Sequence, residues 1–208
     1  MNAIKELYDS FNSKYNDINQ LMIDSSIFYD NKIQVDSSIY NYNIHSAIVE
    51  HCFKSIFLVW EDFLEKSFIL YLCGNKDCKE NSYETYAKPN DAGHAYKLIV
   101  GTKTYPDWTN IDEVNKLADI FFENSGPFIC LKSSPLEFND IKVIRNRLSH
   151  TSQKSKDSFT RLLAKTIYKS KDITVTEFLL TMKETKTSYY SYYIEFVHDY
   201  VKAICNLD

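Results

Sequence analysis

Apolar side chains recur at steps of three and four residues in several parts of this 208-residue chain. The first such stripe predicts an amphipathic helix from about residue 2 to 24. Its apolar positions are Ile4, Leu7, Tyr8, Phe11, Tyr15, Ile18 and Met22. A polar stretch around Asp24 to Asn43 follows, and then a much more apolar one from Ile44 to about Cys73. Its broad apolar face predicts a long central helix that several neighbours bury.

The middle of the chain interrupts this periodicity. Residues Gly74 to Gly93 are polar and include Pro89, so they predict a loop or an insertion. A short helix is predicted from near Ala92 to Gly101. The apolar spacing between Ile111 and Phe122 predicts another helix, which Ser125-Gly126-Pro127 closes.

The start of a further helix is marked by Ser134-Pro135-Leu136-Glu137. Serine caps a helix, proline suits its first turn, and a glutamate three positions later completes a capping box. This helix is predicted to end near His150 or a few residues later. Toward a core it carries Phe138, Ile141, Ile144 and Leu148. Helices are also predicted over Phe159 to Ile167 and Tyr189 to Ile204, whereas Asp172 to Met182 fits either a strand or a helix.

Composition favours helices throughout. Glycine and proline number only 4 each while apolar residues make up 44% of the chain, which disfavours a turn-rich β architecture. We therefore expect an all-α bundle in a single domain, with an N-terminal helix and connector in residues 1–40 and the core in residues 41–208. The five cysteines form no CxxC pair, so no disulfide framework is indicated. With no signal peptide and no apolar run near roughly 18 residues, we expect a cytoplasmic protein with no membrane partner.

Charge is distributed unevenly along the chain. The net charge is −4, yet the segment from Ile141 to Lys171 carries nine lysines and arginines against one acid, Asp157. A basic segment in an otherwise acidic chain attracts a polyanion locally. The alternative is a basic helix face that only solvent covers.

Arginine is the most informative residue type here. Only three arginines occur among the 24 basic residues, and two of them lie in Arg145-Asn146-Arg147-Leu148-Ser149-His150. Arginine offers a rigid, permanently charged fork that matches phosphate oxygens, and histidine is the side chain that exchanges protons near neutrality. This hexapeptide predicts a phosphate-handling site. The alternative is that three arginines lie close together by chance in a lysine-rich chain.

Helical geometry constrains how these residues meet. Asn146 and His150 are four residues apart and share a helix face, while Arg145 and His150 are separated by about 140° of rotation. Either the helix ends before His150, so that the ring turns back, or a second copy of the helix supplies the missing group.

The hexapeptide resembles the Arg-x4-6-His motif of HEPN domains, in the form with asparagine directly after the arginine. It also falls near the end of a helix in the C-terminal part of an all-helical chain, as in that family. The long apolar helix with Trp60-Glu61-Asp62-Phe63 is similar to the family's preceding core helix, so the resemblance covers residues from about 40 to 205.

Membership of this family implies a metal-independent endoribonuclease of toxin–antitoxin, phage-defence or CRISPR-associated systems, with no cofactor. The implied partners are RNA, a second copy of the chain, and an antitoxin or nucleotidyltransferase. His150 would act as general base on a ribose 2′-hydroxyl or as acid on the leaving oxygen, Arg145 would stabilise charge at the phosphorus, and Asn146 would orient one of them. The products would carry a cyclic 2′,3′-phosphate end and a 5′-hydroxyl end.

Other residues are expected to contact only the RNA backbone: Arg147, Lys154, Lys156 and Arg161. Each site residue also has a structural interpretation. Arg145 could pair with a carboxylate such as Glu61, His150 could cap its helix through the helix dipole, and Asn146 could be structural.

The remaining histidines, His45, His51, His94 and His198, show no metal-ligand spacing and are expected to pack in the core or lie on the surface. Two other classes of function stay open. One is a non-catalytic HEPN-like dimer that binds RNA, a nucleotide or a partner protein. The other is a helical interaction protein unrelated to HEPN domains.

Overall fold

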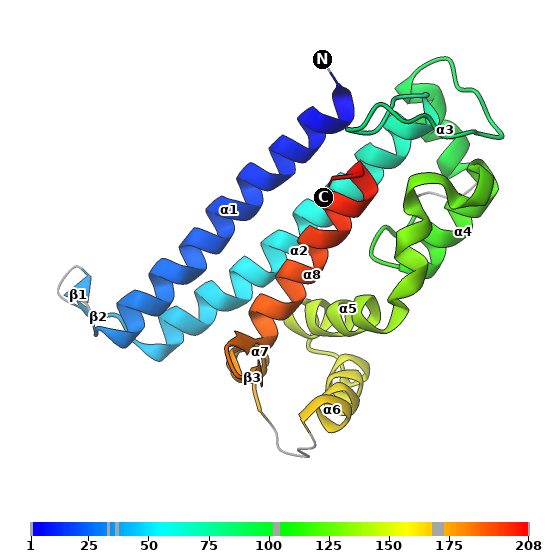
Figure 1. Ribbon diagram of the computed structural model, residues 1–208. Helices are drawn as coiled ribbons and strands as arrows, with labels where there is room; N and C mark the ends of the chain where they lie inside the picture. Colours follow the sequence, from blue (N-terminus) through cyan, green and yellow to red (C-terminus); the bar gives the residue numbers. More distant parts are fainter. Residues whose placement is uncertain (1, 33, 36–37, 102–104, 168–172, 208) are drawn as a thin grey trace. The chain divides into compact units, whose positions relative to one another are not determined.

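The computed structural model of the chain describes residues 2–32, 34–35, 38–101, 105–167 and 173–207 (Figure 1). The predicted all-α class is confirmed, because helices dominate the described residues. These helices are α1 (Ala3–Asp30), α2 (Tyr42–Leu72), α3 (Ala92–Val100), α4 (Ile111–Phe121), the 3-10 segment η1 (Glu123–Ser133), α5 (Pro135–Ser149), α6 (Gln153–Ile167), α7 (Val175–Leu180) and α8 (Tyr189–Cys205). Two antiparallel hairpins pair β1 (Gln34–Val35) with β2 (Ser38–Ile39), and β3 (Met182–Glu184) with β4 (Thr187–Ser188). No described helix is both long enough and apolar enough to cross a bilayer.

The predicted helix boundaries agree with the structure except at the end of the first helix and at the start of α6, which begins at Gln153, six residues before the predicted Phe159. α2 begins at Tyr42 and ends at Leu72, close to the predicted limits. α1 continues to Asp30, six residues beyond the predicted end. Its extension contains Ser25, which is only 2% exposed. The Ser25 hydroxyl lies 2.8 Å from Tyr40 Oη and 2.7 Å from His45 Nδ1. A polar residue that is buried with hydrogen bonds to other parts of the chain adds no apolar position to the helical pattern, so the pattern does not reveal it.

Contacts between Cα atoms divide the chain into two compact units. The first unit contains residues 1–12, 60–139 and 196–208, and the second contains residues 13–59 and 140–195. Because α1, α2, α5 and α8 are each continuous across these limits, every one of them contributes one segment to each unit.

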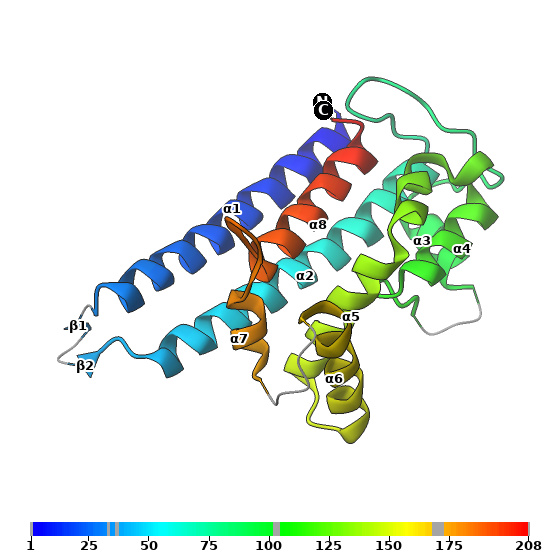
Figure 2. The ribbon, with the colours of Figure 1, turned by 60° about the horizontal axis from the view of Figure 1, so that its bottom comes forward.

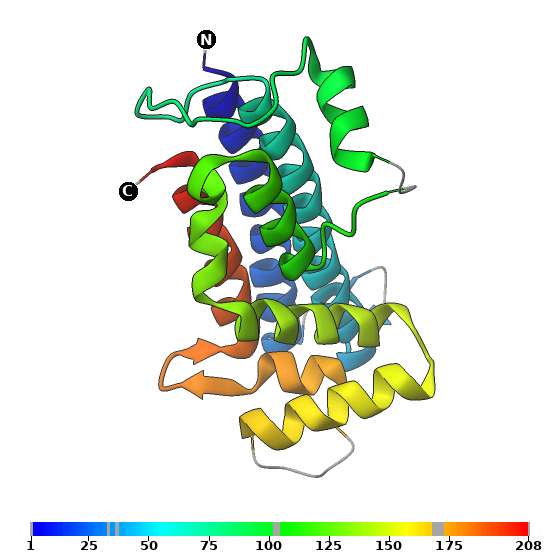
Figure 3. The same cartoon turned by 90° about the vertical axis from the view of Figure 1, so that its right-hand side faces the viewer.

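An aromatic cluster forms the core of the first unit. The ring of Phe68 stacks on Phe128 at 4.9 Å between centroids and meets Phe122 edge-on at 5.1 Å. The loop that joins α2 to α3, visible with α3 and α4 in Figure 3, packs by polar contacts instead. Its Asp77 is fully buried and accepts hydrogen bonds from Tyr83 Oη and Asn206 Nδ2, both at 2.9 Å.

The second unit packs the later part of α1 antiparallel to the early part of α2. The segment with the ambiguous pattern resolves into helix α7 followed by strand β3, and Figure 2 shows the β3–β4 hairpin leading from α7 into α8. A capping box starts α7, since Thr174 Oγ1 accepts from the backbone N–H of Glu177 while Glu177 accepts from the backbone N–H of Thr174. Residues 168–172 lie outside the described part of the chain.

In the same unit α6 turns back along α5, and the two run antiparallel (Figure 3). An ion pair between Lys165 Nζ and Asp140 Oδ2 at 3.4 Å joins the end of α6 to the early part of α5. The apolar face of α6 is buried through Phe159, Leu162 and Leu163. The turn between the two helices is therefore held at a fixed position in this unit, and the arginine-rich hexapeptide leads into it.

Candidate functional site

The hexapeptide occupies the last two turns of α5 and the first residue beyond it. α5 ends at Ser149, as predicted, and the backbone N–H of His150 still donates to the Asn146 carbonyl at 2.9 Å. His150 therefore continues the helical hydrogen bonding while its side chain is exposed at the start of the turn.

Two side chains hold the backbone of His150. The hydroxyl of Ser155 lies 2.8 Å from the His150 carbonyl, and Arg147 Nη1 donates to the same oxygen at 3.2 Å. The hydroxyl of Ser152 accepts from the backbone N–H of Ser155 at 3.3 Å and so caps the N-terminus of α6. The turn is thus a rigid connection, although most of its residues are exposed.

Asn146 and His150 line the same cavity, as their four-residue spacing predicts. Its volume is about 220 Å³. The lining residues are Val143, Asn146, His150, Ser152, Lys154, Ser155 and Ser158. We call this space the His150 cavity. Among the described residues the His150 imidazole has no hydrogen-bond partner, so both ring nitrogens are available for proton transfer.

Arg145 contacts this arrangement from outside. Its Nη1 donates to Asn146 Oδ1 at 3.3 Å, which leaves the Asn146 Nδ2 group as a donor. Arg145 is not among the described residues that line the His150 cavity. The structure therefore brings Asn146 and His150 together in one copy of the chain, and it connects Arg145 to Asn146 rather than to the cavity.

The predicted RNA-backbone residues separate into distinct places. Lys154 lines the His150 cavity, whereas Arg147 and Lys156 line a second cavity of about 430 Å³, which we call the Arg147 cavity. Arg161 is exposed and donates to Ser158 Oγ at 3.1 Å. Within the basic segment, Lys165 pairs with Asp140, and residues 168–171 fall outside the described chain. Only part of the positive charge in the segment from Ile141 to Lys171 therefore lies near the two cavities.

Sequence reasoning missed the hydroxyl groups of the site. Ser149, Ser152, Ser155 and Ser158 follow one another at intervals of three residues, and the last three line the His150 cavity. No periodic signal in the sequence could have grouped them, since the chain turns between α5 and α6 and only Ser155 and Ser158 share one helix. Hydroxyl groups there can donate to phosphate oxygens.

The other histidines behave as packing or surface residues. His45 is 3% exposed and stacks on Tyr29 at 5.0 Å, and burial lowers its pKa despite the opposing charge of Asp30. Burial likewise lowers the pKa of His198, whose Nε2 lies 3.0 Å from Asn12 Oδ1. In the part of the chain that the structure describes, no three His, Cys, Asp or Glu side chains are arranged to hold a metal ion.

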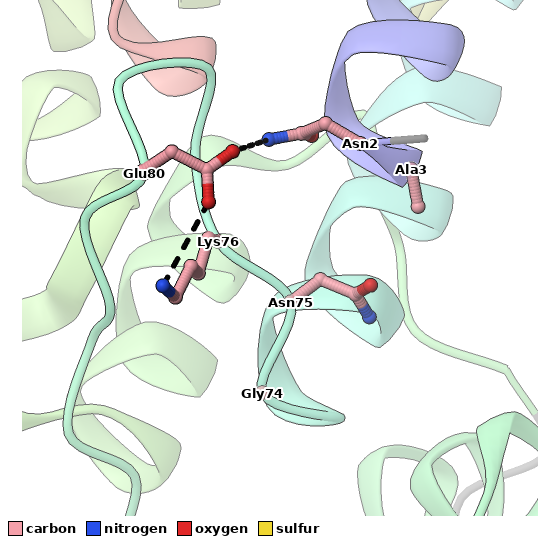
Figure 4. A pocket seen from close by; sticks show the side chains of 6 residues that line it. All are labelled: Asn2, Ala3, Gly74, Asn75, Lys76 and Glu80. Carbon is pink, nitrogen blue, oxygen red and sulfur yellow. Dashed lines mark hydrogen bonds and ion pairs between the residues drawn. The ribbon is translucent and has the colours of Figure 1, made fainter.

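A larger space in the first unit has a different character (Figure 4). It has a volume of about 600 Å³ and is lined by Asn2, Ala3, Gly74, Asn75, Lys76 and Glu80. Glu80 lies between its two partners, 3.7 Å from Lys76 Nζ and 3.3 Å from Asn2 Nδ2. Since its two charged side chains pair with each other, this space offers little attraction for an anion.

The His150 cavity is thus the place where an imidazole, an amide donor and a cation meet. Comparison of the chain with protein-family models, with curated proteins and with solved structures finds no match.

Proposed function

We propose that the chain is a metal-independent endoribonuclease that resembles HEPN ribonucleases and cleaves RNA at the His150 cavity. The observation that carries the proposal is the shared cavity of Asn146, His150 and Lys154 at the end of α5. A cation there attracts a phosphate, an amide N–H fixes one of its oxygens, and an imidazole transfers a proton.

The chemistry follows from these three groups. In the attack step the ribose 2′-oxygen bonds to the adjacent phosphorus, its proton passes to a base, and the 5′-oxygen leaves with a proton from an acid. His150 serves as that base or as that acid, and water takes the other role. Asn146 Nδ2 and Lys154 Nζ donate to phosphate oxygens that gain charge in the transition state. The products are a cyclic 2′,3′-phosphate and a 5′-hydroxyl.

Arg145 completes the site from a second copy of the chain in this proposal. In one copy its guanidinium hydrogen-bonds Asn146 and lies outside the His150 cavity lining. A twofold axis that passes beside α5 would present the Arg145 of one copy to the His150 cavity of the other. Dimerisation then forms part of the active site.

Regulation is part of the proposal, because a ribonuclease with a broad target harms its own cell. We therefore propose a toxin or phage-defence effector whose activity an antitoxin or nucleotidyltransferase partner restrains. Arg147, Lys154, Lys156 and Arg161 contact the RNA backbone in this proposal and give the association its salt dependence.

The test is incubation of the purified chain with total RNA in excess EDTA, followed by analysis of the product ends. We expect cleavage with cyclic phosphate ends, and a rate at least about 10² lower for His150→Ala. His51→Ala is the matched control, because His51 is also exposed and lies in the same unit. Cleavage that survives His150→Ala, or that EDTA abolishes, refutes the mechanism and favours a binding module.

A further inference from the structure

The Arg147 cavity lies beside the candidate active site and is not used by the cleavage chemistry. It is formed by Arg147 of α5, by one face of α6 and by the two residues before α7. The α6 residues Lys156, Phe159, Thr160 and Leu163 follow at helical spacing, and the pre-α7 residues are Ile173 and Thr174. All of these residues belong to the second unit.

Its lining combines two kinds of surface. Phe159 and Leu163 are only 4% and 3% exposed, so they form an apolar floor. Lys156 and Thr160 are exposed at the rim, and Arg147 is half-buried. Two cations beside an apolar floor suit a ligand that carries both a phosphate and a flat apolar ring, since a base packs against apolar side chains while its phosphate contacts the cations.

Arg147 connects this cavity to the active site. Its side chain lines the Arg147 cavity, and its Nη1 donates to the His150 carbonyl at 3.2 Å. A phosphate that contacts this guanidinium is therefore close to the residue that transfers protons. In a single RNA strand, the nucleotide next to the cleaved linkage would occupy such a position.

We propose that the Arg147 cavity binds one ribonucleotide of the RNA substrate, next to the cleaved one. Arg147 and Lys156 hold its phosphate, and its base packs on Phe159 and Leu163. This inference rests on the proposed function. It adds a specificity determinant, because the size of the cavity, about 430 Å³, limits which base enters. A free nucleotide carries the same phosphate and base as a nucleotide within an RNA strand, so the experiment compares both ligands.

The experiment uses His150→Ala chain labelled for NMR, which binds RNA without cutting it. The probes are a short single-stranded oligoribonucleotide, uridine 3′-monophosphate and inorganic phosphate. We expect the oligoribonucleotide and the mononucleotide to shift the amide resonances of Phe159, Thr160 and Leu163, and each to displace the other. Inorganic phosphate alone should bind more weakly, because it cannot use the apolar floor.

Two further variants in this background test the cavity by different routes. Lys156→Gln should weaken mononucleotide binding about fivefold by removing one phosphate contact. Thr160→Trp fills the rim without changing charge and should also weaken binding about fivefold while leaving its salt dependence unchanged. Lys14→Gln is the control, because it removes an exposed charge from the same unit outside the described cavity linings and should change mononucleotide affinity less than about twofold.

The outcomes separate this inference from the proposed function. Oligoribonucleotide shifts that spare the cavity, or mononucleotide binding that the oligoribonucleotide does not displace, would overturn the inference. Equal losses for Lys156→Gln and Lys14→Gln would also overturn it, since the effect would then come from general charge. Cavity shifts by the oligoribonucleotide, combined with no cleavage by the unmodified chain, would support the binding site and reject the ribonuclease.

Discussion

Two connections in this molecule use their polar residues in opposite ways. The loop between α2 and α3 in the first unit directs them inward, so that Asp77 is fully buried and accepts from the backbone N–H groups of Lys79 and Asn81 at 2.8 and 2.9 Å. The turn between α5 and α6 in the second unit satisfies its backbone with Ser155 and Arg147 and leaves His150 and Lys154 exposed. The polar groups of the loop bond to one another inside the unit, whereas His150 and Lys154 of the turn face solvent.

The two connections also differ in what their polar residues surround. Asp77 forms hydrogen bonds with residues near both ends of the described chain. Asn2 Nδ2 donates to its backbone carbonyl at 2.7 Å, and Asn206 Nδ2 donates to its carboxylate at 2.9 Å. In the turn, the second unit holds a cation, an amide and an imidazole around one cavity. The following predictions test whether each connection has the role assigned to it.

The largest expected effect is on stability, from Asp77→Ala. Its removal leaves several buried donors without their acceptor, so we expect a loss of about 4 kcal/mol in the free energy of unfolding. Urea denaturation measures it. Asp91→Ala, which removes the exposed cap of α3, should cost only about 1 kcal/mol. Similar losses for both variants would show that the loop is not held by Asp77.

The same carboxylate should make stability depend on pH. Burial acts to raise the pKa of Asp77, but hydrogen bonds from Asn81, Asn206 and Tyr83 outweigh it and lower the pKa below the ordinary value of 3.8. A lowered folded-state pKa stabilises the fold above the ordinary value, and this contribution disappears as the pH falls through the folded-state pKa. Asp77→Asn should therefore show a shallower loss of stability below about pH 4 than the unmodified chain does.

The next effect is on cleavage, from Arg145→Lys. Lysine keeps the charge and loses the planar fork, so we expect a rate about 10² lower with an unchanged melting temperature. Mixing Arg145→Lys chain with His150→Ala chain should restore about a quarter of the activity, because half of the dimers then contain one complete site out of two. Failure of the mixture to recover would place both groups in one copy.

A smaller effect is expected from the basic residues around the cavities. Replacing Lys154, Lys156 and Arg161 together with glutamine should weaken RNA binding about tenfold and flatten its logarithmic salt slope by about two. Filter binding over a range of salt concentrations measures both quantities. If the slope stays unchanged, the basic segment faces something other than RNA.

The smallest effect is expected from Ser155→Ala, which removes one support of the turn. Losing the hydroxyl at the His150 carbonyl should cost about 1 kcal/mol of stability and lower the cleavage rate several-fold, because His150 is less well positioned. Ser26→Ala is the control, since that hydroxyl bonds only within its own helix, at 3.1 Å from the Met22 carbonyl. Equal activity of the two variants would mean that the turn does not need Ser155.

Much of the fold followed from local patterns. The apolar stripe of α2, the proline-led start of α5 and its end near His150 were all predicted, because helix periodicity and end signals act over a few residues. Asn146 and His150 lining one cavity also followed from their spacing alone. The apolar pattern over α7 fits either a strand or a helix, although the sequence contains the capping box from Thr174 to Glu177 that starts this helix.

Other features depended on residues that are far apart in the chain. The basic segment begins at Ile141, and the partner of its Lys165 is Asp140. This acid directly precedes the segment and is 25 positions away from the lysine in the sequence. The burial of Asp77 depends on Asn206, at the opposite end of the chain. The Arg147 cavity likewise combines α5, α6 and the residues before α7.

The helical class, most helix limits and the shared face of Asn146 and His150 follow from the sequence alone, because backbone hydrogen bonding and side-chain periodicity are local. Tertiary contacts set which charges are neutralised, which serines surround His150 and where Arg147 points. These properties depend on contacts between segments that the chain brings together when it folds, and no local pattern encodes such contacts.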